Sequence, residues 1–285
     1  RLHRAYHAWQ PSELTALNEA IAAGRPHTVT PELAAFIVEA QSLAAQGNHL
    51  FDPGIGGLIA LWGFQSDEFK AELPSPAAIA AWRKTHPSIA DLTVIGTTVR
   101  SSNRAVALDF GGYLKGVALD RAAALLREQG IANALINIGG NILALGSKEG
   151  RHWRVGIQHP RQSGPMATLE LEDGEAVGTS GDYQRFFEVD GKRYAHLLDP
   201  RTGAPAAETQ AITVVIPGGP RAGTLSDAAS KPLFIAGRGG WQEAARRMGV
   251  SQALRVDADG HVALTAALHR RLNFIGPLPD LEVVP

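Results

Sequence analysis

Apolar residues follow a helical period in the first third of the chain. Spacings of three and four residues predict helices over residues 5–22, 31–45 and 77–84. Thr30 is placed to cap the second of these helices, and Ser12 either caps or interrupts the first. We therefore expect a helical part that covers about residues 1–90.

The pattern changes to short branched and alternating runs after residue 90. These runs predict strands over residues 92–95, 98–100, 104–108, 134–138, 142–145, 153–158, 167–171, 175–177, 186–189, 193–194, 210–216, 254–256 and 262–264. Helical spacing returns over residues 117–129, 222–235 and 241–248. The pattern predicts an α+β fold, with a mainly antiparallel sheet and segregated helices. We expect one domain over residues 1–285, whose sheet-rich core covers about residues 91–285.

The composition of the chain does not change the predicted fold, but it excludes several kinds of partner and chemistry. The 285 residues carry a net charge of −1, so no global field favours nucleic acid or an anionic membrane as a partner. No apolar run is long enough to span a bilayer. The absence of cysteine excludes disulfides, thiolate metal ligands and a cysteine nucleophile. Because the chain begins at Arg1 without a methionine, we expect an upstream segment, such as a signal peptide, outside it.

Candidate chemistry is concentrated in the octet Asp109-Phe-Gly-Gly-Tyr-Leu-Lys-Gly116, between a predicted strand and a predicted helix. Its glycines allow backbone N–H groups to approach a ligand closely, and a helix N-terminus favours an anion. Lys115 adds a positive charge, while Asp109 can accept from hydroxyl or amine donors or hold a cation. The spacing matches neither a Walker loop nor a Rossmann fingerprint. The octet still predicts a phosphate-bearing ligand.

Four further polar groups have both an ordinary and a functional interpretation. Asp52 lies in an apolar stretch rich in glycine and proline, where it holds either backbone N–H groups or a ligand. Residues 178–185 are typical of a solvated loop and also of a ligand contact. His196 enters a polar loop, where an imidazole suits proton transfer. Asp227 and Lys231 are one helical turn apart, as an ion pair or as part of a site.

Five motifs in a fixed order resemble one known family. They are Phe51-Asp52-Pro53 with Leu61-Trp62-Gly63-Phe64, the octet 109–116, Asn137-Ile-Gly-Gly-Asn141, Ser180-Gly181-Asp182-Tyr183, and His196-Leu-Leu-Asp-Pro-Arg-Thr-Gly203. Over about residues 5–240 this order is similar to the ApbE family, the FAD:protein FMN transferases. The resemblance implies a T-fold-like α+β architecture with FAD in a cleft between the sheet and the helical portion.

The resemblance also implies an activity. Enzymes of this kind bind FAD, cleave its pyrophosphate with Mg²⁺ and attach FMN through a phosphoester bond to a Ser or Thr of a target protein, releasing AMP. By position, the implied catalytic residues are His196 (the general base), Asp227 and Lys231. The implied FAD contacts are Trp9, Leu50, Phe51, Asp52, Asp109, Gly111, Gly112, Lys115, Ser180, Gly181, Leu197 and Leu198. The implied metal ligands are the Gly112 carbonyl, Asp227 and, as a substitute, Ser230.

One departure from the family pattern concerns the metal. The family element usually has Asp-x-x-x-Thr with both side chains facing Mg²⁺, but here the threonine position is Lys231. A protonated lysine has three donors and no acceptor, so it cannot ligate a metal ion. Either Ser230 or water completes a weakened Mg²⁺ site, or the Lys231 ammonium takes the cation position beside Asp227.

The resemblance leads to one main expectation and two rivals. We expect a flavin transferase exported to the bacterial periplasm, whose acceptor is a membrane-bound redox subunit with a Ser or Thr flavinylation motif. A lipid anchor, where there is one, would lie in a segment outside this chain. The rivals are an FAD-binding protein without transfer activity and an FAD pyrophosphatase that uses water as nucleophile.

Overall fold

The computed structural model describes residues 2–66, 68–277 and 280–285. It confirms the α+β class, with helices and mostly antiparallel sheets. The chain forms two compact units, which do not follow the expected boundary near residue 90. The first comprises Arg1–Gly112 and Arg185–Ala206, and the second comprises Tyr113–Gln184 and Ala207–Pro285. Whether the chain counts as one domain stays a prediction.

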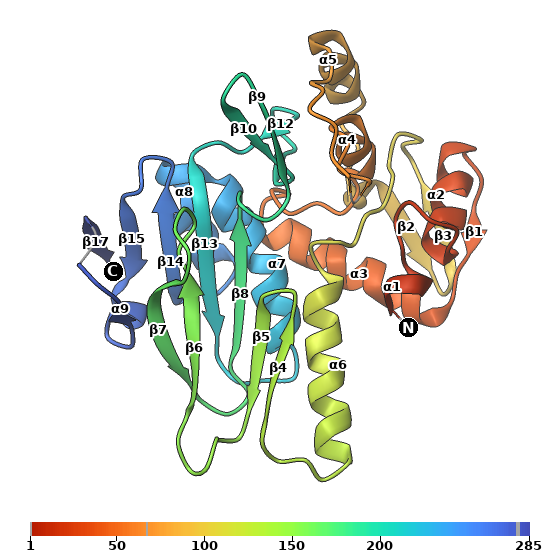
Figure 1. The fold of residues 1–285 in the computed structure, drawn as a ribbon. Coiled ribbons are helices and arrows are strands. Elements are labelled where there is room, and N and C mark those ends of the chain that lie inside the picture. The colour runs from red at the N-terminus through yellow and green to blue at the C-terminus, as the bar shows by residue number, and fades with distance from the viewer. Residues whose placement is uncertain (1, 67, 278–279) are drawn as a thin grey trace. The chain divides into compact units, whose positions relative to one another are not determined.

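The first unit holds the helices α1 to α5 and three small sheets (Figure 1). Its helices are α1 (Leu2–Ala5), α2 (Glu13–Ala22), α3 (Pro31–Gln46), α4 (Gly56–Leu61), α5 (Pro76–Thr85) and the 3₁₀ turn η1 (Ile89–Asp91). Its strands are β1 (His27–Thr28), β2 (Leu92–Ile95), β3 (Thr98–Ser101), β9 (Phe186–Val189), β10 (Lys192–Ala195), β11 (Leu198–Asp199) and β12 (Ala204–Pro205). Strands β1, β3 and β2 form one sheet in that order, and the other four form two antiparallel pairs.

Local capping decides where the first helices begin. The Thr30 hydroxyl accepts the Leu33 amide at 3.2 Å and Pro31 occupies the first turn, which confirms the predicted helix α3. The single helix predicted over residues 5–22 is wrong, because Ser12 starts a new one. Its hydroxyl accepts the Thr15 amide at 3.1 Å, and its own amide donates to Thr15 Oγ1 at 2.9 Å, closing a capping box ahead of α2.

The second unit contains one large sheet of seven strands and a smaller sheet. The strands of the unit are β4 (Ala134–Ile138), β5 (Asn141–Leu145), β6 (Trp153–Gln158), β7 (Pro165–Leu171), β8 (Ala176–Gly181), β13 (Thr209–Ile216), β14 (Gln252–Asp257), β15 (Val262–Thr265), β16 (Asn273–Phe274) and β17 (Leu281–Val284). Its helices are α6 (Leu114–Glu128), α7 (Ala222–Ile235), α8 (Gly237–Arg247) and α9 (Ala266–His269). The large sheet has the order β17-β15-β14-β13-β8-β5-β4, and β16-β7-β6 form a second sheet.

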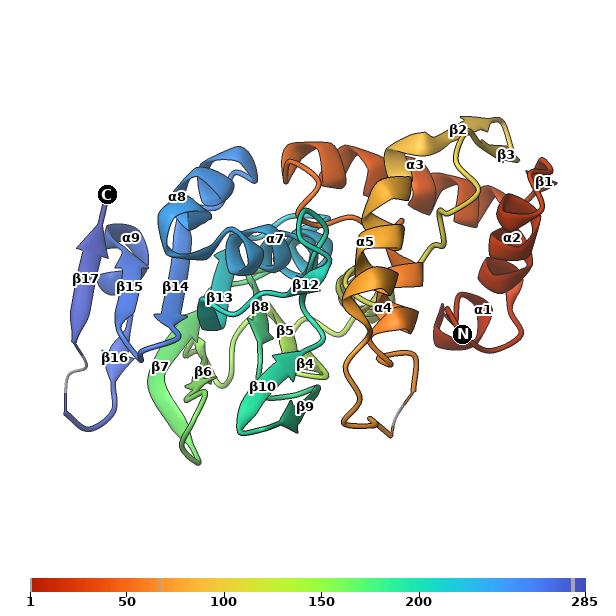
Figure 2. The same cartoon turned by 90° about the horizontal axis from the view of Figure 1, so that it is seen from above.

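Helices pack on one face of the large sheet and strands on the other. Figure 2 shows α7 and α8 on one side and the strands β6 and β7 on the other. A hydrophobic core lies on the β6–β7 side, where Ala144, Val177 and Val215 pack with Val155 and Leu169. Strand β13 is buried along its whole length because it lies in the middle of the sheet. In the described part of the chain, no helix combines the length and the apolar character that crossing a bilayer requires.

Two predicted elements near the candidate site differ from the structure. Residues 104–108 form no strand, and only Ala107 makes a bridge, to Ile55. The residues Val106 and Leu108 are apolar because they fill the core of the first unit, not because they lie in a sheet. Residues 178–181 are not a solvated loop but the end of β8, buried except for a half-buried Thr179. The next helix begins at Leu114, so Lys115 and Gly116 lie in its first turn.

Candidate functional site

In the second unit, Asp227 links two helices. The Gly116 amide, in the first turn of α6, donates to Asp227 Oδ2 at 2.9 Å. Asp227 is fully buried in α7, and burial alone would raise its pKa. The charges of Lys231 and Lys115 and the hydrogen bonds from Lys231 and Gly116 outweigh burial and hold the pKa of Asp227 below its ordinary value. Asp227 is therefore a carboxylate at neutral pH.

Lys231 is bound to Asp227 twice. Its ammonium donates to the Asp227 carboxylate and, at 2.8 Å, to the Asp227 backbone carbonyl. Burial lowers the pKa of Lys231 despite the opposing charge of Asp227, and the charge of Lys115 lowers it further. Two lysines thus surround one carboxylate at the N-terminus of α6, which gives this position a net positive charge. Such a position favours an anion.

The hydroxyl groups of Ser180 and Ser230 form hydrogen bonds within the protein. Ser230 Oγ donates to the Asp227 carbonyl at 2.8 Å and lies 2.8 Å from Ser180 Oγ. Gly181 is buried, and a Cβ there would collide with the ring of Tyr183. Gly178 lies where β8 meets α7, and a Cβ there would collide with the backbone of Ser226. Gly178 is therefore required by close packing of the helix on the sheet, and Gly181 by the ring of Tyr183.

Asp120 fixes α7 against α6. Its carboxylate accepts the Gly223 amide at 2.7 Å, the Thr224 amide at 2.8 Å and the Thr224 hydroxyl at 2.6 Å, and so caps α7 from the neighbouring helix. The helices touch at Gly116, where a Cβ would lie 2.7 Å from the Thr224 Cα. Asp120 had no signal in the sequence, because its partners are about a hundred residues away.

The donor set around Asp227 does not fit Mg²⁺. Magnesium requires several oxygen ligands in octahedral geometry. Both Asp227 carboxylate oxygens already accept hydrogen bonds, Ser230 donates to a carbonyl, and the Lys231 ammonium offers no lone pair. The described ranges also contain no group of three or more His, Asp or Glu side chains that could hold a metal ion. The Gly112 carbonyl belongs to the first unit.

In the first unit, Asp109 and Trp9 lie around Arg185. The Asp109 carboxylate accepts the Gly111 amide at 2.7 Å. Burial raises the pKa of Asp109 above its ordinary value, against the effects of the Gly111 N–H and the charges of Arg185 and His7. The Arg185 guanidinium lies 5.8 Å from the Trp9 ring centroid and donates to the Phe64 carbonyl at 2.9 Å. Arg185 is a functional candidate that the sequence does not single out, since it is only the last residue of the polar stretch 178–185.

His196 is oriented by the same arginine. Its Nδ1 lies 3.1 Å from the backbone carbonyl of Arg185, and its amide donates to that carbonyl at 3.0 Å. Because a carbonyl oxygen only accepts, Nδ1 carries the proton, and the lone pair of the neutral imidazole is on Nε2. The ring also meets Phe64 edge to face, with centroids 6.3 Å apart. Leu197 and Leu198, which follow it, are both buried.

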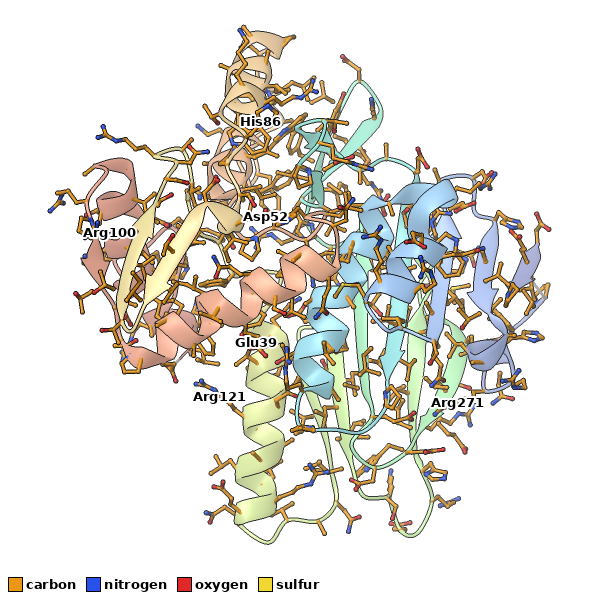
Figure 3. All side chains as sticks on the ribbon, turned by 180° about the vertical axis from the view of Figure 1, so that it is seen from behind. Glu39, Asp52, His86, Arg100, Arg121 and Arg271 are labelled. Atoms are coloured by element: carbon orange, nitrogen blue, oxygen red, sulfur yellow. The ribbon has the colours of Figure 1, made fainter. Side chains whose placement is uncertain are left out.

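Asp52 lies in the loop between α3 and α4 (Figure 3) and has a structural role. Its carboxylate accepts the amides of Gly54 and Ile89, both at 2.8 Å, and the Ser88 hydroxyl at 2.5 Å. Asp52 also pairs with His49 at 3.2 Å, and this hydrogen bond raises the pKa of His49. These contacts favour the interpretation that Asp52 holds backbone groups.

The segment around Asp52 lies beside Asp109 and the residues just before it. The Pro53 carbonyl accepts the Asp109 amide at 2.8 Å, and the Gly56 amide donates to the Ala107 carbonyl at 2.7 Å. Leu50 and Phe51 are buried just before this contact. The first unit therefore groups Trp9, Asp109, Gly111, Gly112 and His196 around Arg185 and the 50–56 loop. The second unit groups Lys115, Ser180, Asp227, Ser230 and Lys231.

Comparison with known proteins gives a consistent result. A family model described as the ApbE family matches residues 1–254. An FAD:protein FMN transferase of Rhodobacter capsulatus is 42% identical over 275 residues, which cover 96% of this chain and 52% of that protein. One from Treponema pallidum is 33% identical over 244 residues, which cover 79% of this chain and 65% of that protein. The chain thus spans about half to two thirds of the length of these relatives.

Solved structures agree with the fold. The ApbE protein of Thermotoga maritima has a TM-score of 0.80 at 30% identity, over 90% of this chain and 83% of that one. The flavinyl transferase ApbE of Pseudomonas stutzeri, in its apo form, has a TM-score of 0.81 at 28% identity, over 97% of this chain and 85% of that one. These matches confirm the α+β architecture expected from the sequence.

Proposed function

Because this chain belongs to the ApbE family, we propose that it is an FAD:protein FMN transferase. The observation that carries the proposal is the pair of ammonium groups, Lys115 and Lys231, about Asp227 at the N-terminus of α6. This arrangement suits a bound diphosphate, and diphosphate cleavage needs positioning and cationic stabilisation more than covalent help.

The transfer step exchanges one phosphorus–oxygen bond for another. The oxygen of a Ser or Thr hydroxyl on the acceptor bonds to the FMN phosphorus, while the bond from that phosphorus to the bridging oxygen breaks. AMP leaves with the bridging oxygen, and the hydroxyl proton goes to the general base. His196 suits this role because its Nδ1–H is held by the Arg185 carbonyl, which puts the accepting lone pair on Nε2.

The remaining residues bind and position FAD. We assign to the first unit the contacts made by Trp9 and Asp109, with the backbone of Gly111 and Gly112. Trp9 offers an aromatic face, and Asp109 accepts from hydroxyl or amine groups of the ligand. Lys115 in the second unit takes the diphosphate. Asp52, Ser180 and Gly181 act through the backbone and packing that they support.

The acceptor and the location are proposed from the resemblance to the family. We assign the protein to the bacterial periplasm, and its acceptor to a membrane-bound redox subunit with a Ser or Thr flavinylation motif. No step in this scheme is assigned to Mg²⁺, because the residues around Asp227 do not offer it a ligand set.

Mass spectrometry tests the activity. Purified protein is incubated with FAD and a candidate acceptor peptide that contains Ser or Thr, beside the same peptide with Ala at that position. A mass gain of one FMN on the first peptide alone, with release of AMP, supports the transferase. Free FMN and AMP without modified peptide would instead identify an FAD pyrophosphatase, and unchanged FAD an FAD-binding protein.

A further inference from the structure

We propose that Lys231 is a built-in cation that replaces the metal ion, so that this protein binds and cleaves FAD without Mg²⁺. The inference rests on the proposed function and concerns the same site. The inference starts from the ion pair between the Lys231 ammonium and the Asp227 carboxylate. A metal site at Asp227 would need an oxygen ligand at this position, and the ammonium stands there instead.

The hydrogen-bond capacity of Lys231 leaves room for a ligand. An ammonium group has three N–H donors. Asp227 takes two of them, one through its carboxylate and one through its backbone carbonyl at 2.8 Å. The third donor is available for a diphosphate oxygen, and the side chain keeps 13% of its surface exposed.

The rest of the site holds Lys231 in this position. Asp227 cannot turn away from it, because its second carboxylate oxygen is fixed by the Gly116 amide at 2.9 Å. Lys115 directly precedes Gly116, whose amide donates to Asp227, and the charge of Lys115 lowers the pKa of Lys231. A dication here would be repelled by both lysines, whereas a diphosphate would neutralise them.

The test uses the wild type, Lys231→Thr and Lys231→Met, each with EDTA or with millimolar Mg²⁺. FAD affinity is measured by flavin fluorescence, and metal binding by the thermal shift that Mg²⁺ causes without FAD. For the wild type we expect equal FAD affinity and transfer in both conditions and no thermal shift. Lys231→Thr should lose about tenfold or more in FAD affinity in EDTA and recover it with Mg²⁺. Lys231→Met should lose the affinity in both conditions.

Two failures are distinguishable in this experiment. A wild type that works only with Mg²⁺, and whose melting temperature rises with the metal, would overturn the inference and leave the transferase intact. A wild type that ignores FAD in both conditions would overturn the proposed function itself. If Lys231→Thr does not fold, the comparison of the wild type in EDTA and in Mg²⁺ still decides the matter.

A second inference comes from Asn141, the first residue of β5. Its side chain is 1% exposed, and its Nδ2 has no hydrogen-bond partner among the described residues. A buried donor without a partner is uncommon and requires an explanation. Ile142 and Ala144 face the core beneath β6 and β7, so strand alternation places Asn141 on the opposite face of the sheet.

That opposite face carries the diphosphate-binding candidates. There Gly178 and Ser180 of β8 meet α7, whose Asp227 binds Gly116 of α6. The turn before Asn141 also lies beside Lys115, because a Cβ on Gly139 would be 3.6 Å from the Lys115 Cδ. We infer that the Asn141 amide donates to a phosphate oxygen of FAD, in support of Lys115.

An isosteric variant separates binding from structure. Asn141→Leu removes the donor without leaving a cavity, so the ligand-free protein should melt at the same temperature or higher. Its FAD dissociation constant should rise about 10- to 100-fold. Asn137→Ala is the control for the hairpin, because the Asn137 side chain accepts the Gly140 amide at 3.0 Å. This control should bind FAD within a few-fold of the wild type.

Three outcomes would count against Asn141. Unchanged FAD affinity in Asn141→Leu would overturn the inference, and so would a lower melting temperature, since that indicates a structural role. Equal loss of affinity in Asn137→Ala would point to hairpin geometry instead of the amide. If the wild type itself fails to bind FAD, the proposed function fails first.

Discussion

The imidazole of His196 and the backbone of Arg185 form a paired contact, in which one carbonyl oxygen lies 3.1 Å from Nδ1 and 3.0 Å from the His196 amide. The arginine side chain extends from this point to the Phe64 carbonyl and to the ring of Trp9. One residue therefore connects the proposed base to a proposed flavin contact within the first unit.

His196→Gln should reduce FMN transfer about 10²- to 10⁴-fold, because a glutamine cannot take the proton of the acceptor hydroxyl. FAD affinity should stay within a few-fold of the wild type, since the base does not hold the nucleotide. The check is single-turnover transfer beside a fluorescence titration with FAD. A variant that loses FAD binding and transfer together would show that His196 contributes to binding and not to proton transfer.

Asp109→Asn should stabilise the ligand-free protein at neutral pH while weakening FAD binding. The raised pKa means that the folded state binds this proton more tightly than the unfolded chain, so burial of the carboxylate costs stability above that pKa. An amide of the same shape removes the charge and still accepts from Gly111. We expect a melting temperature about 2–4 °C higher at pH 7 to 8 and no difference near pH 4. Melting curves over this range provide the measurement.

His49→Asn should destabilise the protein more at low pH than at high pH. The pKa of His49 is raised by Asp52, so the pair contributes stability fully below about pH 6.5 and loses it as pH rises through the raised value. Asparagine tolerates the positive φ of 51–57° found at residues 48 and 49. The side chain is 42% exposed, so solvent screening limits the difference to about 1–2 °C. A difference in melting temperature between the wild type and the variant that grows as pH rises would contradict this account.

Gly178→Ala should destabilise the second unit by about 1–3 kcal/mol, because the added methyl group meets the backbone of Ser226, which cannot move aside. Gly219→Ala is a matched control in the same unit, since a Cβ there has nothing within 4 Å. Urea unfolding of the two variants measures the difference. Equal midpoints would show that α7 and β8 are less closely packed than described.

The sequence predicted elements whose limits are set by neighbours in the chain. Helix α3 was found because Thr30 and Pro31 mark its start, and α7 was predicted with the bounds that it has in the structure. The strand at 104–108 was wrong because a run of apolar residues does not distinguish a strand from a buried loop. The loop interpretation of residues 178–185 was wrong for 178–181, which end strand β8, where Gly178 is required by close contact with Ser226, nearly fifty residues further on.

The candidate site could be predicted only as motifs. The octet and His196 are recognisable from their local sequence motifs. Lys231 is recognisable because it stands at the threonine position of the family element. The hydrogen bond from Gly116 to Asp227 joins residues 111 positions apart, so no local pattern predicts it. Arg185 remained unnoticed because its contacts with Phe64 and Trp9 depend on how three distant segments fold together.

The cap that Asp120 provides has a consequence for how this region can change over evolution. Because an acidic side chain of α6 completes the first turn of α7, neither helix can shift along the other without breaking three hydrogen bonds. An insertion or deletion in one would have to be matched in the other. A change of a single side chain beside Asp227, such as one at position 231, would leave these three hydrogen bonds and the pairing of the two helices in place.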